Sequence, residues 1–349
     1  MIEINKSPVL TSKHYGINHF VIDDDVIIEK INLLQKNQVI ISDADNVKID
    51  ELKIYPQNNL SKEIDVFVKD GSNFAKEITI SKTSESPFEI KFSPTQNLAD
   101  TILLTINENV SAKVIFKYLS NEKLYHYTTL KIILKHGALL DFAELLAISN
   151  SNNFISIEII SDTNSQINFH AIDINSQTLV QNIKFVQVGD FSSATLNSIY
   201  LSNKQSQTSL NYLFEVFGKN CNSKISASGV LNDFACKNFI GTIDFKKGST
   251  GSIGDEDEFC LVLSKHCKSK STPILLCHEE DVDGKHSTST GKVDEDDLFY
   301  VMSRGIERQQ AVKLLIEAKL KKQIEIIFDE SFRTEVLKMI ENWLTKENN

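Results

Sequence analysis

The sequence lacks the features that mark several common functional classes. Its 37 Lys and Arg residues are outnumbered by 47 Asp and Glu residues, which gives a net charge of −10. Binding to a phosphate backbone needs a concentrated basic face, and the Lys residues of this chain are scattered among acidic ones, so a nucleic-acid partner is disfavoured. No apolar run approaches the roughly 18 residues that span a bilayer, so we expect no membrane interaction.

A secretory layout is also missing from the first residues, MIEINKSPVL, where a charged segment followed by an apolar one would mark a signal peptide. We therefore expect a cytoplasmic protein. The frequent Lys, Asn and Ile residues are typical of an AT-rich genome, which leaves a plastid-type organelle as the alternative location.

Motifs of common catalytic sites are missing as well. The chain contains no G-x-x-x-x-G-K-[ST], no G-x-S-x-G and no H-E-x-x-H. It therefore has no P-loop for ATP hydrolysis, no nucleophile elbow and no zinc-protease helix.

Cysteine is scarce and odd in number. The five cysteines are Cys221, Cys236, Cys260, Cys267 and Cys277. An odd count in a chain with no secretory signal argues against a disulfide framework. Their clustering favours either metal or sulfur chemistry, or the use of Cys as a small hydrophobic residue inside strands.

From about residue 61 to residue 290 the sequence is a succession of strand-like runs. Runs of four to eight residues rich in Ile, Val, Phe and Thr, such as EIDVFV, FEIKF and AKVIFKYL, are each closed by Asn, Ser, Gly or Asp. One segment, GALLDFAELLAI at 137–148, fits either a helix or short strands that flank a turn at Asp141. The first 60 residues contain a helix candidate at 24–35 and two strand-like pieces, QVIISD and VKIDELKIYP.

A loose repeat runs through this strand-rich part. Turn-like sites recur at intervals of about 26 to 30 residues, which is the range of solenoid repeats. These sites are Gly137, Thr163, Gly189, Gly218 and Gly248. We predict a right-handed parallel β-helix, with a β-sandwich as the alternative.

Beyond residue 293 the pattern becomes helical. Asp294 is a suitable N-cap with acidic residues in the following turn, and Gly305 is well placed to end that helix. A second helix is expected from about residue 307 to 322, and a third from about residue 331. The residues expected to face the core are Ala311, Leu314, Leu315 and Ala318 in the second helix, and Phe332, Val336, Ile340 and Trp343 in the third.

These helices have two compatible predicted roles. A solenoid whose last coil is uncovered exposes a sheet edge, so the helices are expected to cap that end, to dock a partner, or to do both. The predicted organisation is mainly β, with an N-terminal mixed segment at 1–60, a β-helix core at 61–290 and a C-terminal α-helical domain at 291–349.

The stretch at 278–311 joins the strand-rich and helical parts and carries a specific pattern. His286 is followed by Ser and Thr residues, Gly291, a short acidic segment, LFY at 298–300 and SRGI at 303–306. This pattern resembles the end of the core of the SufB/SufD family, the scaffold proteins of the sulfur-mobilisation (SUF) system of iron–sulfur cluster assembly. The resemblance implies a parallel β-helix and a non-catalytic scaffold. Such a scaffold binds no cofactor tightly and holds a transient cluster at the interface with its partner.

The resemblance also implies roles for individual residues. His286 takes the position of a histidine that faces the SufB–SufD interface, and neutral imidazole suits iron ligation and proton transfer. Ser287 stands where SufB proteins carry Glu, which favours a SufD-like chain, and Gly284 stands where relatives often carry Cys. In the sequence, Cys267 lies close to the position at which SufB proteins carry their sulfur-accepting cysteine. If Cys267 is a surface thiol, the basic side chains beside it should lower its pKa; an incidental turn cysteine is the alternative.

Six residues that bind soft or borderline metals fall within a short stretch: Cys260, His266, Cys267, Cys277, His278 and His286. Their spacing matches no zinc ribbon, but residues on adjacent coils stack about 4.8 Å apart, so a shared site stays open. The candidates for the cluster interface are His286, Cys267, Cys277 and His278, with His286 as the metal ligand. The acidic runs at 255–258 and 279–283 are interpreted as solvated turns, with acid–base catalysis as the alternative.

The predicted partners also follow from the resemblance. A SufB-like subunit would pair with the last β-helix strands, and a SufC-like ATPase would dock on the C-terminal helices. The docking candidates are Leu298, Phe299, Tyr300, Ser303, Arg304 and Gly305. Two alternatives stay open: a homodimer that performs SufB and SufD roles together, and a β-helix carbohydrate-active enzyme that uses the acidic runs.

Overall fold

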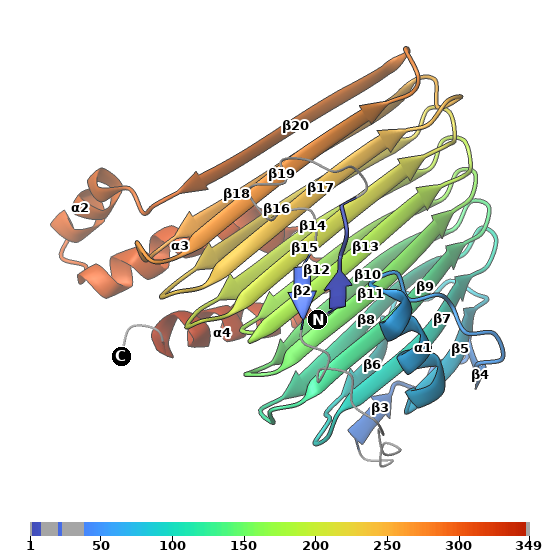
Figure 1. The fold of residues 1–349 in the computed structure, drawn as a ribbon, viewed down its shortest axis with the longest axis horizontal. Helices are drawn as coiled ribbons and strands as arrows, with labels where there is room; N and C mark the ends of the chain where they lie inside the picture. The colour runs from blue at the N-terminus through green and yellow to red at the C-terminus, as the bar shows by residue number, and fades with distance from the viewer. Residues whose placement is uncertain (1, 8–19, 23–37, 347–349) are drawn as a thin grey trace.

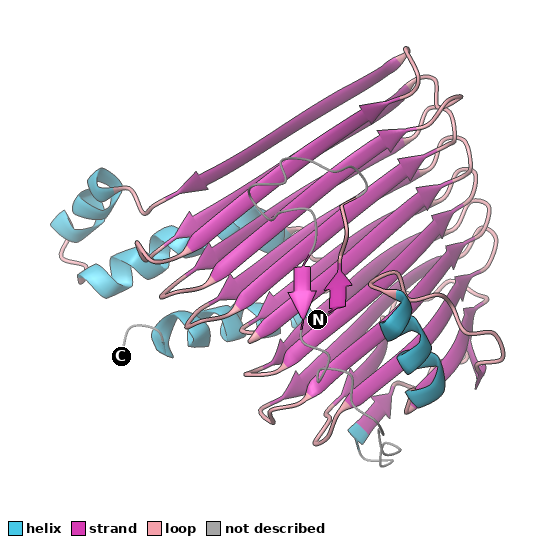
Figure 2. Cartoon of the chain, viewed as in Figure 1, coloured by secondary structure: helices cyan, strands magenta, loops and turns pink. Residues whose placement is uncertain are grey.

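The chain forms a parallel β-solenoid with helices on its flanks (Figures 1 and 2). The computed structural model describes residues 2–7, 20–22 and 38–346. Two nine-stranded sheets, which we call sheet I and sheet II, face each other across a packed interior. The chain alternates between them, so that one strand from each sheet makes one coil.

Within each sheet, neighbouring strands follow one another in chain order. Sheet I contains β3 (Val39–Ile41), β6 (Phe88–Phe92), β8 (Ser111–Ser120), β10 (Leu139–Ile148), β12 (Gln166–Ile174), β14 (Ser193–Ser202), β16 (Asn222–Leu231), β18 (Ser252–Val262) and β20 (Val282–Gly291). Sheet II contains β4 (Val47–Glu51), β5 (Phe74–Ile80), β7 (Leu98–Ile106), β9 (Tyr125–Leu134), β11 (Asn152–Ser161), β13 (Thr178–Gln187), β15 (Gln207–Val216), β17 (Cys236–Phe245) and β19 (Lys268–Cys277).

The remaining elements lie outside the two sheets. A small antiparallel pair is formed by β1 (Ile2–Ile4) and β2 (Phe20–Ile22). The helices are α1 (Lys62–Gly71), α2 (Glu295–Ser303), α3 (Arg308–Glu325) and α4 (Glu330–Lys346).

Pairing within each sheet is parallel after the first strand pair. Strands β3 and β4, which precede residue 61, pair antiparallel with β6 and β5, and the later neighbours pair parallel in continuous register. Parallel strands need crossover connections, and in this fold the facing sheet supplies them. The predicted parallel β-helix is confirmed, and the β-sandwich alternative is wrong. The division of the chain at residues 60 and 290 stays a prediction.

The predicted turn sites stack on one edge of the solenoid. The backbone N–H of Gly137, a residue at φ 66°, donates to the carbonyl of Thr163 at 3.0 Å. A Cβ on Gly218 would lie 2.2 Å from the carbonyl oxygen of Gly189. Because these two turns approach so closely, any residue with a Cβ at position 218 would collide with the turn next to it, and glycine is required there.

The interior is filled by side chains that stack from coil to coil. In sheet I, Phe116, Phe142 and Phe169 contact one another at centroid distances of 5.0 and 4.8 Å. In sheet II, Phe185 stacks on Phe214 at 4.2 Å. In-register strands place like residues above one another, so these ladders belong to a single continuous core.

Helices cover the outer face of each sheet. Helix α1 buries Ile64 and Val68 against Tyr127 and Phe154 of sheet II. Helices α3 and α4 pack on β12, β14 and β16 of sheet I, where Gln323 Nε2 donates to Ser226 Oγ at 3.3 Å. The C-terminal helices therefore lie along a flank, and the prediction that they cap the open end is wrong. No helix in the described residues is long and apolar enough to cross a bilayer.

Two local predictions in the strand-rich part need correction. The run EIDVFV, predicted as a strand, belongs to α1: Ser61 Oγ accepts from the N–H of Ile64, and the buried residues are four apart, as on one helix face. In the ambiguous segment at 137–148, one continuous strand, β10, covers Leu139–Ile148, so neither the helical interpretation nor a turn at Asp141 holds. The helix candidate at 24–35 lies outside the described residues.

The C-terminal helices follow the sequence prediction in part. Asp294 caps α2 by accepting from the N–H groups of Asp296 and Asp297, and Gly305 has φ 85° just beyond it. Helix α4 buries the four residues predicted for it: Phe332, Val336, Ile340 and Trp343. In α3 the predicted stripe is wrong except for Ala311. The residues that it buries are Ala311, Ile316, Leu320, Gln323 and Ile324.

Candidate functional site

The candidate site is the uncovered end of the solenoid, formed by β19 and β20. These strands are last in their sheets, and within the described part of the chain no strand pairs with their outer edges (Figure 1). Strand β20 has the sequence VDGKHSTSTG and is exposed along most of its length. Each earlier coil is covered by the next one, whereas this polar terminal coil has no coil above it among the described residues.

His286 lies on the inner side of this terminal coil. In parallel strands, paired residues point to the same face, and His286 pairs with the buried Glu256 of β18. The neighbouring contacts agree: Thr290 Oγ1 lies 3.3 Å from Ser269 Oγ of β19. His286 thus continues an interior row, and it is exposed because no further coil among the described residues covers it.

Directly beneath the terminal coil lies a buried polar network. Lys237 Nζ lies 2.7 Å from Glu258 Oε1, and neither side chain is exposed. Tyr200 donates its hydroxyl to the same carboxylate at 2.6 Å, and Ser271 Oγ donates to the other oxygen at 2.9 Å. Burial, with Cys260 and Glu258 beside it, raises the pKa of Tyr200 well above its usual value. With three donors the Glu258 carboxylate is satisfied.

The two acidic runs have different environments. In 255–258, alternate residues point inward, and burial raises the pKa of Glu256 to about 8, with a further contribution from Glu258 and Asp257. The interpretation of this run as a solvated turn is therefore wrong. The run at 279–283 does begin as a turn, in which Glu279 Oε2 accepts from the N–H of Gly248 at 2.9 Å.

Cys267 lies in the turn between β18 and β19 and is half-buried. Its thiol contacts the carbonyl of Asp233 at 3.6 Å. Burial raises the pKa of Cys267. The lowered pKa was expected only for a surface thiol, and this thiol is half-buried. Its basic neighbours in sequence, Lys265, His266 and Lys268, are exposed, whereas the thiol is packed. A role in accepting sulfur stays a prediction.

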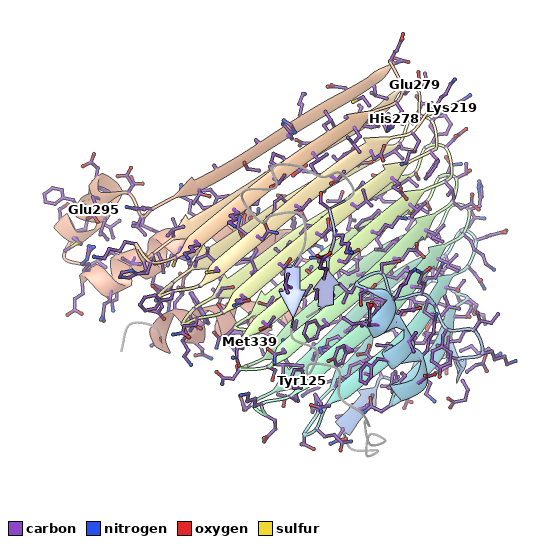
Figure 3. All side chains as sticks on the ribbon, in the orientation of Figure 1. Tyr125, Lys219, His278, Glu279, Glu295 and Met339 are labelled. Atoms are coloured by element: carbon purple, nitrogen blue, oxygen red, sulfur yellow. The ribbon has the colours of Figure 1, made fainter. Side chains whose placement is uncertain are left out.

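Cys277 and His278 lie at the opposite end of β19, about 30 Å from Cys267 at the usual rise per residue. His278 Nε2 lies 3.6 Å from Asp244 Oδ1. Figure 3 shows His278 and Glu279 at the corner before β20, far from Glu295 of α2. The structure does not bring the four interface candidates together. Within the described residues, no three His, Cys, Asp or Glu side chains are grouped to hold a metal ion.

The docking candidates lie on or just after α2. Leu298 is buried, whereas Phe299 and Tyr300 are 74% and 60% exposed. Arg304 donates to the Tyr300 hydroxyl at 2.9 Å and lies over its ring, and Ser303 donates to the Tyr300 carbonyl at 2.7 Å. The helix thus presents an aromatic pair that is held in place locally and is not packed into the core.

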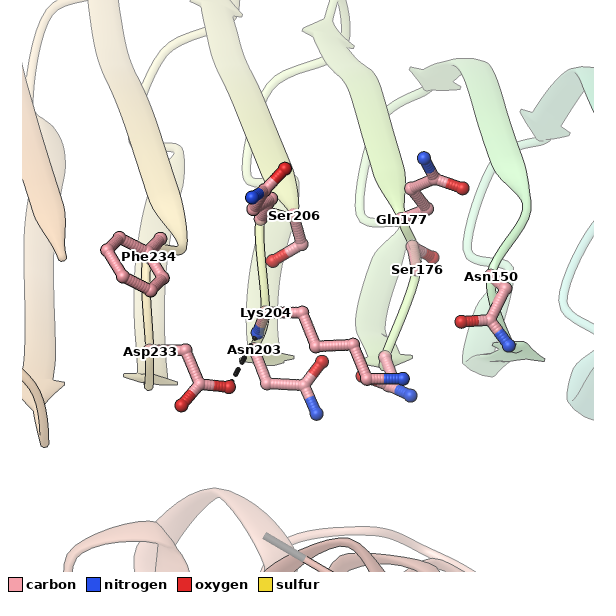
Figure 4. A pocket seen from close by; sticks show the side chains of 10 residues that line it. Asn150, Ser176, Gln177, Asn203, Lys204, Ser206, Asp233 and Phe234 are labelled. Carbon is pink, nitrogen blue, oxygen red and sulfur yellow. Dashed lines mark hydrogen bonds between the residues drawn. The ribbon is translucent and has the colours of Figure 1, made fainter. Parts of the chain in front are cut away.

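A separate cavity of about 490 Å³ lies along the stacked turns that lead from sheet I to sheet II (Figure 4). Its lining consists mainly of Asn, Gln and Ser side chains. Among the described residues that line it, Asp233 supplies the one carboxylate, which accepts from the N–H of Lys204 at 2.9 Å. A glycosidase needs a pair of carboxyl groups facing the bond to be cleaved. This cavity therefore gives no support to the carbohydrate-active alternative.

Comparison with known proteins decides the family. The sequence model of the SUF system FeS cluster assembly, SufBD core domain, matches residues 90–319, which is well over half of the chain. The chain belongs to the SufBD family. The resemblance seen in the pattern around His286 is thereby confirmed.

This SufBD chain is similar to two proteins named iron-sulfur cluster assembly protein SufD. With that of Bacillus subtilis it shares 32% identity over 125 residues, which cover 36% of this chain and 29% of the relative. With that of Escherichia coli it shares 23% identity over 240 residues, which cover 68% and 57%. It is also 23% identical over 152 residues to the SufBD family protein ycf24 of Guillardia theta, covering 44% and 32%. The chain thus spans less than two thirds of the length of each.

The polar residues beneath the terminal coil were not predicted as part of the site. Lys237 was not singled out, and Glu256 and Glu258 were considered only as members of the acidic run at 255–258, although the alternation in SIGDEDEFC places these two carboxylates on one face of a strand. That alternation was the available signal, because a strand inside a solenoid must bury every second residue.

Proposed function

We propose that this SufBD chain is a SufD-like scaffold subunit that has no turnover of its own and pairs with a SufB-like subunit through the terminal coil. The observation that carries the proposal is the uncovered edge of β20. Alternate residues along this ten-residue strand direct their backbone donors and acceptors to the open side, and none of the ten residues is proline. An exposed strand edge of this kind is a ready template for strand addition by another chain.

The two terminal strands differ in how well they can pair. Strand β19 contains Pro273, which lacks a backbone N–H and is tolerated at an edge. Strand β20 has no such interruption, so it is the better pairing strand. A partner strand along β20 would cover His286, Thr288 and Thr290 and turn the terminal coil into an interface.

The cargo of that interface is a nascent iron–sulfur cluster. His286 is the accessible imidazole on the inner side of β20, and neutral imidazole is a good ligand for iron. Gly284 on the same strand supplies no thiolate. The remaining ligands of the cluster would come from the partner. The completed cluster would then leave the interface as the product of assembly.

The ATPase partner would dock on α2. Exposed aromatic residues beside an arginine are typical centres of protein interfaces, and Phe299, Tyr300 and Arg304 provide this combination. Helix α2 follows β20 directly in the chain and contacts α3. A movement of the docked ATPase would therefore be transmitted to the terminal coil through the few residues that join β20 to α2.

The pairing is tested by two matched lysine substitutions on β20. Thr288→Lys places a charge on the inner face, where a partner would bury it, whereas Ser287→Lys places it on the outer face. Both positions are exposed in the chain alone, so both variants should fold. After coexpression with SufB-like and SufC-like subunits, Thr288→Lys should lose the SufB-like subunit and Ser287→Lys should retain it.

Equal recovery of the partner by both variants would contradict pairing through β20. If the wild-type chain recovers no SufB-like subunit and forms a dimer that Thr288→Lys dissociates, the homodimer alternative replaces the SufD-like one. His286→Ala should keep the complex intact but lower its iron and acid-labile sulfide; unchanged contents would remove His286 from the site.

A further inference from the structure

The cavity of about 490 Å³ along the turns from sheet I to sheet II has no part in the proposed function (Figure 4). Its lining comes from four successive turns, and in each turn one lining residue has a left-handed backbone. These residues are Asn150, Asn175, Lys204 and Asp233, at φ 58°, 70°, 53° and 55°. Because Asn and Asp tolerate this conformation well, the turns keep a similar shape and repeat along one edge of the solenoid.

Strand register explains why a cavity forms at this point. Residues 175–177 connect the same two strand positions that residues 202–206 connect in the next coil. In the preceding coil, residues 147–151 connect the positions that 174–177 connect here. The turn between β12 and β13 is therefore shorter than both of its neighbours, and the shorter turn leaves space between them.

The lining offers hydrogen-bonding groups that the fold does not use. The side-chain amides of Asn150, Gln177 and Gln205 are exposed, and that of Asn175 is half-buried. None of these four amides bonds to another described residue. A side-chain amide both donates and accepts hydrogen bonds, so a ligand that satisfies this lining must carry groups that do the same.

An aromatic ring lies at one end of the cavity. Phe234 is 55% exposed and is the one apolar side chain among the described residues of the lining. Its ring stacks on that of His266 in the following turn, at a centroid distance of 4.8 Å, which fixes its orientation. A ring held in this way gives a flat apolar surface on which the C–H face of a sugar ring can pack.

Two other classes of ligand fit this cavity less well. The charges of Lys204 and Asp233 offset each other, so an anionic ligand meets no net positive charge. An extended peptide needs a free strand edge or apolar anchor pockets. The backbone of these turns is already paired between coils: Gln177 donates its N–H to the carbonyl of Ser151 at 3.0 Å, and Phe234 donates to that of Lys204 at 2.8 Å.

We propose that this cavity binds a neutral oligosaccharide, in an extended chain of 1,4-linked sugar units. Sugar hydroxyl groups both donate and accept hydrogen bonds, as the lining amides do. Successive turns lie about 4.8 Å apart, so the four turns span roughly 14 Å and repeat at close to the length of one sugar unit in such a chain. Asp233 is the one carboxylate in the described lining, whereas hydrolysis uses a pair. The oligosaccharide is therefore bound and not cleaved.

The test is a calorimetric titration of the purified full chain with two probes, cellotetraose and chitotetraose. At least one should bind to the wild type, and Phe234→Ala and Gln177→Ala should each weaken that binding by about five- to tenfold. Both positions are exposed, so both variants should fold. Phe191→Ala and Gln166→Ala are the matched controls at the opposite edge of the solenoid, where both side chains are exposed, and should keep wild-type affinity. Binding of neither probe at millimolar concentration, or unchanged affinity in Phe234→Ala and Gln177→Ala, would overturn the proposal.

A measurement on the unaltered chain locates the bound sugar. In isotope-labelled wild-type protein, the probe that binds should first shift the amide signals of residues 175–177 and 203–206. Shifts that start instead at the turns of the opposite edge, 189–192 and 218–221, would contradict the proposed site. Neither experiment involves β20 or a partner subunit, so a failure here is distinct from loss of the SufB-like subunit in the coexpression test.

Discussion

Lys237 and Glu258 form an ion pair from which solvent is fully excluded, with Nζ 2.7 Å from Oε1, one layer below the open end of the solenoid. The pair joins sheet II to sheet I, because Lys237 is on β17 and Glu258 is on β18. Tyr200 and Ser271 complete the hydrogen bonds of the carboxylate. Polar contacts therefore help to hold the last covered coil, and a comparable buried network in an earlier coil joins Asp100 to Tyr118, His126 and Thr128.

Removing one partner of this pair should destabilise the protein strongly. Lys237→Met leaves a buried carboxylate without its cation, which typically costs about 3–5 kcal/mol. The double variant Lys237→Met/Glu258→Gln removes both charges and should recover a large part of that loss. Urea unfolding of the wild type, the two single variants and the double variant measures the difference. If the double variant is as unstable as Lys237→Met, the unpaired charge is not the cause.

The buried carboxyl groups in the middle of the solenoid predict a stability that falls as pH rises. Burial raises the pKa of Glu144 to about 8, with contributions from Asp100 and Asp173, and raises the pKa of Asp173 to about 7. In the unfolded chain such groups ionise near pH 4. The folded chain therefore holds their protons more tightly, and this contribution to stability is complete below about pH 4 and is lost as pH rises towards 7–8.

The variant Glu144→Gln isolates this effect, since an amide does not ionise. Compared with the wild type, it should lose less stability between pH 5 and pH 8.5, by up to about 1.4 kcal/mol for each pH unit below the folded-state pKa. Urea unfolding across this range, with Glu158→Gln at an exterior ion pair as the control, provides the measurement. Parallel pH profiles for the wild type and Glu144→Gln would show that Glu144 is ionised in the folded state.

The two cysteines at the ends of β19, Cys267 and Cys277, should differ in their reactivity towards alkylating reagents. Cys277 is exposed, whereas Cys267 is half-buried and has a raised pKa, so less of it is thiolate at neutral pH. Brief alkylation with iodoacetamide, followed by peptide mass spectrometry, should modify Cys277 several-fold faster than Cys267. If Cys267 reacts first, its surroundings activate it, and its candidacy as a sulfur acceptor gains weight.

The repeating part of the fold was predicted well from the sequence, and its surroundings less well. Turns such as Gly137 and Gly189 recur because every coil must cross the same edge, and this constraint is local enough to be seen in the chain. The segment around Ile64 and Val68 was mistaken for a strand because a short apolar run fits periods of two and of four. The position of α3 and α4 on the flank depends on contacts between distant residues, for which the chain carries no local signal.

The candidate site could be predicted only as far as its motif. The pattern around His286 pointed to the family and to the end of the core. The residues beneath His286 became visible only through strand register, which aligns Glu256 with it although the two are about thirty residues apart in the chain. Activation of Cys267 by its basic neighbours in sequence was expected only if it were a surface thiol. Those side chains are exposed while the thiol is packed, a distinction set by the turn geometry.

Hydrogen–deuterium exchange of the chain alone and in its coexpressed complex tests the central claim most directly. Strand β20 has a neighbour on one side only among the described strands, so in the isolated chain its amides should exchange faster than those of β9 to β17. In the complex, peptides covering 282–291 should become protected while the interior strands are unchanged. Protection confined to other regions, with β20 exchanging as fast as before, would contradict a scaffold that pairs through its terminal coil.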